Sequence, residues 1–223
     1  MTLELAAVVA ALQVGDSQFP SGAFAFSWGL ETLTREGRCG RRQLAALMAA
    51  ELEGRWASFD RVFIRRAMQA DGDSALFEID AEIEAMAWSQ ALREGSRRAG
   101  AGLLTAHDRL GTPGATALRV AVMRGDTPGH LPLAQGVIFR GLGLAPALGL
   151  AVAGYGAMAG LASAAVRLGL AGALETQQAL TTLAPRLAAL AEAEPPAEAG
   201  AFSPLLEIAM LRHGEAAAPL FSN

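Results

Sequence analysis

Residues 41–66, RRQLAALMAAELEGRWASFDRVFIRR, decide the fold. Large apolar side chains recur in this stretch at steps of three and four residues. They are Leu44, Leu47, Met48, Leu52, Trp56, Phe59 and Phe63. This spacing places side chains on one face of an α-helix. Charged residues stand between them, and Glu51 lies four residues before Arg55, which is a favourable ion pair on a helical surface. The stretch therefore predicts an amphipathic helix that packs one face onto a core.

Helical spacing continues on both sides of this stretch. Residues 1–14 have the apolar content of a first helix. Residues 74–93 repeat the helical spacing, and either Asp73 or Ser74 could cap that helix. Near the end, the Ser-Pro pair at residues 203–204 is typical of an N-cap followed by the first helical residue.

Signals for β-structure are absent from the sequence. The short apolar run at residues 137–139 has no partner run joined to it by a hairpin turn. Alanine, the best helix former, is the most frequent residue, and no linker or internal repeat divides the chain. We therefore predict an all-α, single-domain bundle over residues 1–223, with about eight to ten helices and a Gly/Ala-rich core in the C-terminal half.

Composition excludes several classes of function. The 223-residue chain has 18 basic residues, all of them arginine, against 22 acidic residues, so the net charge is −4. This balance argues against binding to nucleic acid, and the absence of lysine removes Schiff-base and Walker-type chemistry. Because Cys39 is the single cysteine, an intramolecular disulfide and a cysteine-based zinc site are excluded. The first residues carry no positive charge and residues 15–17 make a poor cleavage site, so we expect a cytoplasmic protein.

Residues 141–166 carry no charge, and this length is sufficient to cross a bilayer. The content argues against a span, because the run is mostly Gly and Ala, contains Pro146 and has no aromatic belt. Gly156 and Gly160 form a G-x-x-x-G pair, which allows two helices to approach closely. We predict a helix buried in the core or at a subunit interface, and a membrane-associated helix remains the alternative.

Candidate catalytic groups are few. His107-Asp108 is a doublet of the kind that metal-dependent phosphohydrolases use, but no histidine precedes it, so a surface or capping role is expected and the phosphohydrolase remains an alternative. His130 stands between two prolines, where a structural role, such as capping the next helix, is expected. The acidic residues at 78, 80, 82 and 84 are expected to form a solvated face.

Residues 19–31, FPSGAFAFSWGLE, form a segment that we call the opening segment. Proline and glycine constrain its entry turn, and Phe24, Trp28 and Glu31 follow at steps of four and three residues. Gly29 costs a helix about 1 kcal/mol relative to alanine, so a close packing contact is expected there. From physical chemistry alone, the segment predicts a helix start packed into the core.

The opening segment resembles the first motif of the urease accessory protein UreF family, [LF]-P-x-G-x-[FY]-x-x-S-x-G-L-E. The positions that carry the match are Pro20, Gly22, Phe24, Ser27, Gly29 and Glu31. Three further blocks resemble family motifs in the same order: residues 91–100 (ALREGSRRAG), residues 129–136 (GHLPLAQG) and residues 203–213 (SPLLEIAMLRH). The resemblance extends over essentially the whole chain.

The resemblance implies an all-helical, dimer-forming protein without catalytic activity or a cofactor of its own. Members of the family help to mature urease, the nickel enzyme, without contacting nucleic acid or a membrane. They bind the accessory protein UreD, also called UreH, and recruit and regulate the GTPase UreG, so that nickel passes to the urease apoprotein. The family places Glu31 on its GTPase-facing surface, and Arg167 matches a basic position there. Arg212 and His213 belong to the C-terminal segment that becomes ordered against UreD.

The chain departs from the family pattern at two places. After Arg167, residues 169–177 read GLAGALETQ where the family has V-P-x-G-Q. In the C-terminal tail, Gly214 replaces a glutamate, and residues 216–223, AAAPLFSN, lack the arginine of the family ending. Residues 214–223 are expected to form a flexible tail.

Overall fold

The structure is a computed structural model, and it describes residues 4–16, 18–20, 26–212 and 220–221. Within these ranges the regular structure is entirely helical. The elements are α1 (Leu5–Gly15), α2 (Leu30–Arg35), η2 (Arg41–Gln43), α3 (Leu44–Glu51), η3 (Leu52–Asp60), α4 (Arg61–Gln69), α5 (Gly72–Met86), α6 (Gln90–Arg109), α7 (Ala115–Arg124), α8 (Leu131–Gly141), α9 (Pro146–Arg167), α10 (Ala173–Glu192) and α11 (Pro204–Leu211). The all-α prediction is confirmed.

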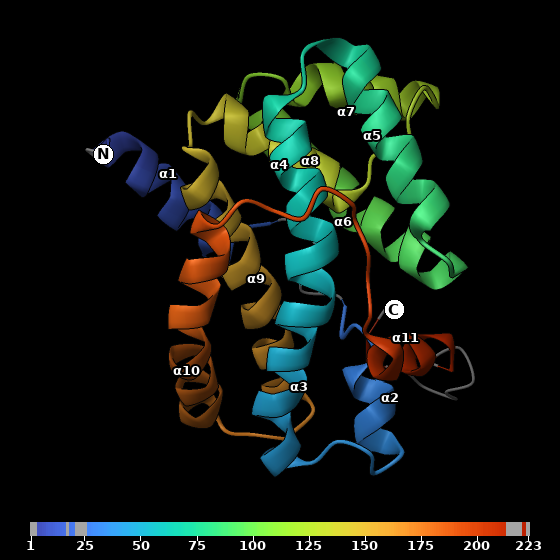
Figure 1. The fold of residues 1–223 in the computed structure, drawn as a ribbon, viewed down its shortest axis with the longest axis vertical. Coiled ribbons are helices and arrows are strands. Elements are labelled where there is room, and N and C mark those ends of the chain that lie inside the picture. Colours follow the sequence, from blue (N-terminus) through green and yellow to red (C-terminus); the bar gives the residue numbers. More distant parts are fainter. Residues whose placement is uncertain (1–3, 17, 21–25, 213–219, 222–223) are drawn as a thin grey trace.

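The predicted helix over residues 41–66 is one continuous rod that runs from η2 through α3 and η3 to α4 (Figure 1). All seven apolar residues of the predicted stripe are buried. The sequence did not predict the π-helical winding of η3. There, the Gly54 and Ser58 carbonyls accept hydrogen bonds from the backbone N–H groups of Phe202 and Gly200, at 2.6 and 2.9 Å. A side chain at Gly54 would collide with the Phe202 carbonyl, so the returning chain passes directly against the rod.

Helix α9 lies at the centre of the C-terminal half, packed against α10, α1 and the rod (Figure 1). Its glycines have two different roles. A side chain at Gly154 would collide with Leu187 and Trp56, so this glycine permits close packing in the predicted small-residue core. Gly156 and Gly160 have no atom within 4 Å of an added Cβ in the described part of the chain, so this G-x-x-x-G pair does not join two helices of one chain.

Helix α9 is long and apolar enough to cross a membrane by length and composition, and half of its most apolar window is buried inside the protein. The core helix of a soluble protein passes the same test, so this feature is weak evidence for a span. Helix α1 is shorter, and its small side chains face the core while its larger apolar side chains face outward. It buries Ala7 and Ala11 and exposes the larger side chains of Leu5, Val9 and Leu12.

Helix ends differ from the sequence expectations in three places. The predicted helix over residues 74–93 is two helices, α5 and α6, because Ser89 caps α6 by accepting the Leu92 N–H at 3.2 Å. Neither Asp73 nor Ser74 caps α5, since that helix already begins at Gly72. Helix α11 begins at Pro204 as expected, but the Ser203 hydroxyl makes no capping hydrogen bond.

Candidate interaction surface

The described end of the opening segment forms a turn at residues 28–29 that leads into α2. Gly22 and Phe24 lie outside the described residues, whereas Pro20 and residues 26–31 are described. Ser27 is fully buried, and its hydroxyl oxygen accepts a hydrogen bond from the Glu31 backbone N–H at 3.4 Å. Gly29 has a φ of 89°, a backbone conformation that favours glycine. The segment therefore enters α2 through a turn that side-chain and backbone constraints both fix.

Gly29 also permits the close contact that its sequence context predicted. An added Cβ would lie 2.5 Å from the Leu206 carbonyl oxygen and 3.2 Å from the Ala209 Cβ, so the start of α2 rests directly on α11. On its other side, the segment contacts α6. The Phe26 and Trp28 rings lie 5.3 Å apart against Gly95, and the Arg98 guanidinium lies 5.0 Å from the Phe26 ring centre. Three of the blocks that resemble UreF motifs thus meet in space.

Glu31 is buried, with 7% of its surface exposed, although it stands in the first turn of a short helix. Its two carboxylate oxygens accept successive backbone N–H groups of the C-terminal tail, Oε1 from Leu220 at 2.8 Å and Oε2 from Phe221 at 3.3 Å. The Phe221 ring is buried, and its centre lies 4.1 Å from the Cζ atom of Arg167. The structure therefore brings Glu31 and Arg167 together around residues 220–221, which sequence reasoning had not singled out.

Arg212 lies at the other end of α2. Its guanidinium is 3.5 Å from the carboxylate of Glu36, the residue directly after α2, and Arg38 lies 4.0 Å from the same carboxylate. His213 lies outside the described residues. Helix α11 thus carries Arg212 close to α2, and the exposed side chains of Leu205, Ile208 and Leu211 occupy its outer face.

A second buried carboxylate corrects the expectation of a solvated acidic face. Asp80 of α5 is fully buried. Its carboxylate accepts hydrogen bonds from the Thr127 hydroxyl at 2.5 Å, the Gly129 N–H at 2.5 Å and the His130 N–H at 3.0 Å. Leu76 and Ile83 lie four residues before and three residues after Asp80, so this carboxylate sits on the apolar face of α5.

His130 extends the same cluster. Its Nε2 atom lies 2.7 Å from an oxygen of Glu84, and the Arg97 Nε donates to that carboxylate at 3.0 Å. The side chain does not cap α8. Burial lowers the pKa of His130 below its ordinary value, although Asp80 and Glu84 raise it. Burial also raises the pKa of Glu84, but hydrogen bonds from Arg97 and His130 outweigh it, and the result is a lowered pKa. The cluster ties α5, α6 and the start of α8 together.

The expected surface position of His107 is wrong. The side chain is buried, its Nδ1 atom lies 2.8 Å from the Thr112 hydroxyl, and its ring lies 5.0 Å from that of Phe19. The neighbouring Asp108 instead accepts hydrogen bonds from Thr116 and Arg119, at 2.5 and 3.2 Å. The two side chains of the doublet therefore have separate partners. Among the described residues, no group of three or more His, Cys, Asp or Glu is placed to hold a metal ion.

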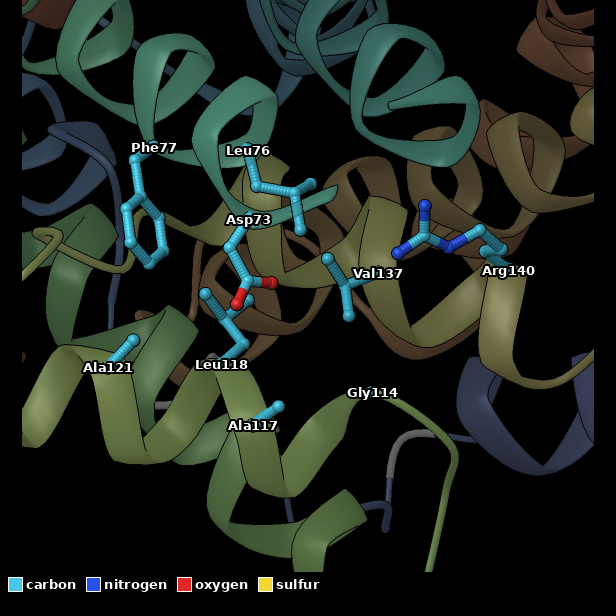
Figure 2. A pocket seen from close by; sticks show the side chains of 9 residues that line it. All are labelled: Asp73, Leu76, Phe77, Gly114, Ala117, Leu118, Ala121, Val137 and Arg140. Carbon is cyan, nitrogen blue, oxygen red and sulfur yellow. The ribbon is translucent and has the colours of Figure 1, made fainter. Parts of the chain in front are cut away.

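Two cavities are candidate ligand sites. The cavity in Figure 2 lies between α5, α7 and α8, and Asp73 and Arg140 are the charged residues of its lining. Its volume is about 50 Å³, which accommodates water rather than a substrate. A wider groove of about 730 Å³ lies between the end of α1 and α6, and its lining includes Phe19, Pro20 and Leu110. Neither cavity contains a catalytic arrangement of side chains.

Fold and surface together define an all-helical protein in which the described end of the opening segment, the end of the central helix and residues 220–221 meet. A model of the UreF family matches residues 39–184. Urease accessory protein UreF of Arthrobacter sp. (strain FB24) is 31% identical over 220 residues, covering 95% of each chain. The proteins of the same name from Trichodesmium erythraeum and Kocuria rhizophila are 26% and 30% identical, covering 96% and 98% of each chain. The chain belongs to the urease accessory protein UreF family.

Proposed function

We propose that this chain is a non-catalytic scaffold of urease maturation in the cytoplasm. In this role it binds UreD (UreH), recruits and regulates the GTPase UreG, and so supports nickel insertion into the urease apoprotein. The observation that carries the proposal is the meeting of Glu31 and Arg167, 136 positions apart in the chain, on the two sides of Phe221. The relatives reported above, each a urease accessory protein UreF, support it.

A scaffold acts by proximity, because partners that are held in one complex have a higher effective concentration. Glu31 and Arg167 suit the recruitment of a partner. A carboxylate and a guanidinium form hydrogen bonds that are shorter and stronger than neutral ones, and arginine is enriched where single residues dominate a protein interface. In this proposal, the GTPase contacts the surface around these two side chains.

Two other faces of the molecule are the proposed contacts for the remaining partners. The outer face of α11, with Leu205, Ile208 and Leu211 exposed beside Arg212, is the proposed contact for UreD. The open face of α9 at Gly156 and Gly160 is the proposed contact of a homodimer, because small residues allow two helices to approach closely. A Gly156→Leu substitution is expected to shift a dimer to monomer in sedimentation, and an unchanged mass would remove this face from the dimer interface.

The recruitment proposal is tested by titrating UreG into the purified complex of this chain with UreD. We expect Arg167→Ala and Glu31→Ala each to weaken binding by about thirtyfold, the loss that is typical of a dominant interface residue. Arg124→Ala is the matched control, because Arg124 is likewise an exposed arginine at the last position of a helix, α7. Undiminished binding and urease activation in both variants would remove Glu31 and Arg167 from the surface that recruits the GTPase.

A further inference from the structure

The connection from α2 to the rod carries a dense positive charge. Residues 35–42, REGRCGRR, hold four of the chain's 18 arginines and one acidic residue, in a chain whose net charge is −4. All four arginine side chains are exposed. The connection runs along the bottom of the bundle in Figure 1, between α2 and the start of the rod. We call its four arginines the basic patch: Arg35, Arg38, Arg41 and Arg42.

The backbone beneath the basic patch is fixed at several points. The N–H groups of Arg38 and Cys39 both donate to the Leu33 carbonyl, at 2.8 and 3.2 Å, so the chain turns sharply after α2. The Cys39 side chain is buried, and the Gly40 N–H donates to Oε1 of Gln43 at 3.1 Å. The backbone therefore needs little further ordering when a partner binds, and such preorganisation favours binding.

Neighbouring carboxylates neutralise only part of the basic patch. The Glu36 carboxylate lies 4.0 Å from Arg38, and it is shared with Arg212 at 3.5 Å. Arg41 forms an ion pair with Glu175 at the start of α10. The other two arginines of the patch form no ion pair within the described part of the chain. Four guanidinium groups thus face two carboxylates, and a positive excess remains at this end of the bundle.

The position of Arg42 is unfavourable for the local fold. Arg41 and Arg42 form the first turn of the rod, and this turn contains no acidic residue. A helix N-terminus carries a partial positive charge, so a basic residue there destabilises the helix, whereas Arg35 in the last turn of α2 is favourable. Glu175 compensates Arg41, but no such pair accompanies Arg42 in the described residues. A negatively charged partner beside Arg42 would offset this cost.

The chemistry of the basic patch favours the carboxylates of a protein partner. A guanidinium pairs with a carboxylate through two parallel N–H···O bonds, which adds geometric specificity to the attraction of charge. Nucleic acid is also negative, but its binding surface is typically a basic stripe or face of a basic domain. Here four arginines lie in one short connection of a chain with net negative charge. A short acidic segment of a protein fits this size and charge.

The basic patch adjoins the proposed recruitment surface. Arg35 follows Glu31 by four residues, which is about one helical turn of α2. Helix α2 packs against α9, which ends at Arg167. We infer that the basic patch receives an acidic segment of the GTPase UreG and steers the GTPase onto the surface around Glu31 and Arg167. This inference rests on the function proposed above.

The first measurement is the association rate of UreG with the purified complex of this chain and UreD, at about 50 and about 300 mM NaCl. Arg38→Glu with Arg42→Glu reverses two exposed charges of the patch. The matched control, Arg109→Glu with Arg124→Glu, changes the net charge equally at the exposed last residues of α6 and α7. We expect the patch variant to slow association about tenfold at low salt and by less at high salt, and the control to have little effect. Equal rates in the two double variants would overturn the inference.

A milder variant guards against an effect on folding. Arg38→Gln with Arg42→Gln removes the two charges and keeps long polar side chains, and it is expected to slow association by an intermediate factor of about three at low salt. Its thermal unfolding should match that of the unchanged chain. An association rate equal to that of the unchanged complex at low salt would also overturn the inference.

A second measurement separates the basic patch from the proposed function. A peptide of about ten glutamates is titrated by calorimetry into the chain alone, without UreG, and the double Glu variant is expected to bind it about tenfold more weakly than the unchanged chain. Equal binding, or none by the unchanged chain, overturns the patch even when UreG needs Arg167. Peptide binding that depends on the patch, with no binding of UreG to the unchanged complex, refutes the proposed function and leaves the carboxylate-binding patch established. A DNA duplex is titrated in the same way, and tighter binding of the duplex than of the peptide would assign the patch to nucleic acid and overturn the inference.

Discussion

Asp80 and Glu31 hold distant parts of the chain with the same chemistry, but their surroundings differ. Each is a buried carboxylate on a helix that accepts successive backbone N–H groups. Asp80 receives a loop that α7 and α8 fix at both ends, and Ser96 of α6 accepts a further N–H from Leu131 of the same region. Glu31 receives residues 220–221, next to the chain end. The first contact, which we call the lock, holds a loop between two helices, whereas the second holds two residues that follow α11 in the chain.

The largest effect is expected when the lock is broken. Asp80→Ala leaves three buried donors, from Thr127, Gly129 and His130, without their acceptor. We expect the free energy of unfolding to fall by roughly 3 kcal/mol or more, measured by urea denaturation. Glu82→Ala on the same helix is the control, because its ion pair with Arg66 is solvent-exposed and such a pair is worth about 0–1 kcal/mol. Similar losses in the two variants would contradict the role of Asp80 as a lock.

The next largest effect is expected in mild acid, which should lower the free energy of unfolding through His130, a neighbour of Asp80 in the lock. Burial lowers the pKa of His130 in the folded protein, so below the ordinary value of about 6.5 the unfolded chain binds a proton that the folded chain does not. Stability contributed by neutral His130 is therefore present above that pH and is lost as the pH falls, with a slope of up to about 1.4 kcal/mol per pH unit. His107, whose pKa burial also lowers, acts in the same direction.

The measurement is urea denaturation at pH 7.5 and 5.5 for the protein and for His130→Gln. Burial raises the pKa values of Glu51 and Asp60, which changes stability in the opposite sense over this range. The difference between protein and variant isolates His130. The variant is expected to lose up to about 1.4 kcal/mol less than the protein on acidification, because about one pH unit of this range lies below the ordinary pKa of histidine. An identical loss in both would show that His130 does not titrate with folding.

A smaller change in stability is expected at Glu31. Glu31→Ala removes the acceptor of the Leu220 and Phe221 N–H groups, and Leu220 is 66% exposed, so its N–H can turn to water. We expect a loss of about 1 kcal/mol in the free energy of unfolding, against the larger loss for Asp80→Ala. The comparison is made by urea denaturation under the same conditions. A loss as large as that of Asp80→Ala would mean that residues 220–221 are held as firmly as the loop on Asp80.

The contrast between these two carboxylates also marks what sequence could predict. The stripe of residues 41–66 specified the rod, because spacing alone places its side chains on one face. Asp80 was wrongly expected on a solvated face, although its spacing indicated burial. Leu76 and Ile83 flank it at helical spacing on the buried face of α5. By contrast, carbonyls of η3 accept hydrogen bonds from Gly200 and Phe202, which are distant in sequence. No local pattern reports such a contact, and the same holds for the burial of His107 against Phe19.

At the candidate surface, the resemblance singled out Glu31 and Arg167, and the structure adds their common neighbour. Gly29 could be predicted as a close contact from its cost in a helix, but its partner on α11 could not. Phe221 is an apolar residue in a polar and alanine-rich tail, which gives no indication of where it docks. Its position depends on a surface made by α2 and α9, which exists only once the bundle has formed.

The smallest effect separates the two forces that hold the Phe221 ring. Phe221→Leu keeps a large apolar side chain in the buried position but removes the aromatic face from Arg167. A cation–π contact at an accessible site contributes about 0.5–1 kcal/mol, so the free energy of unfolding should fall by about that amount. Urea denaturation measures this, with Leu220→Ala as the control. A loss as large as that of Phe221→Ala would mean that the ring's contact with Arg167, rather than its burial, holds the ring. No loss at all would mean that burial alone holds it, and the comparison with Asp80 would then rest on the backbone hydrogen bonds.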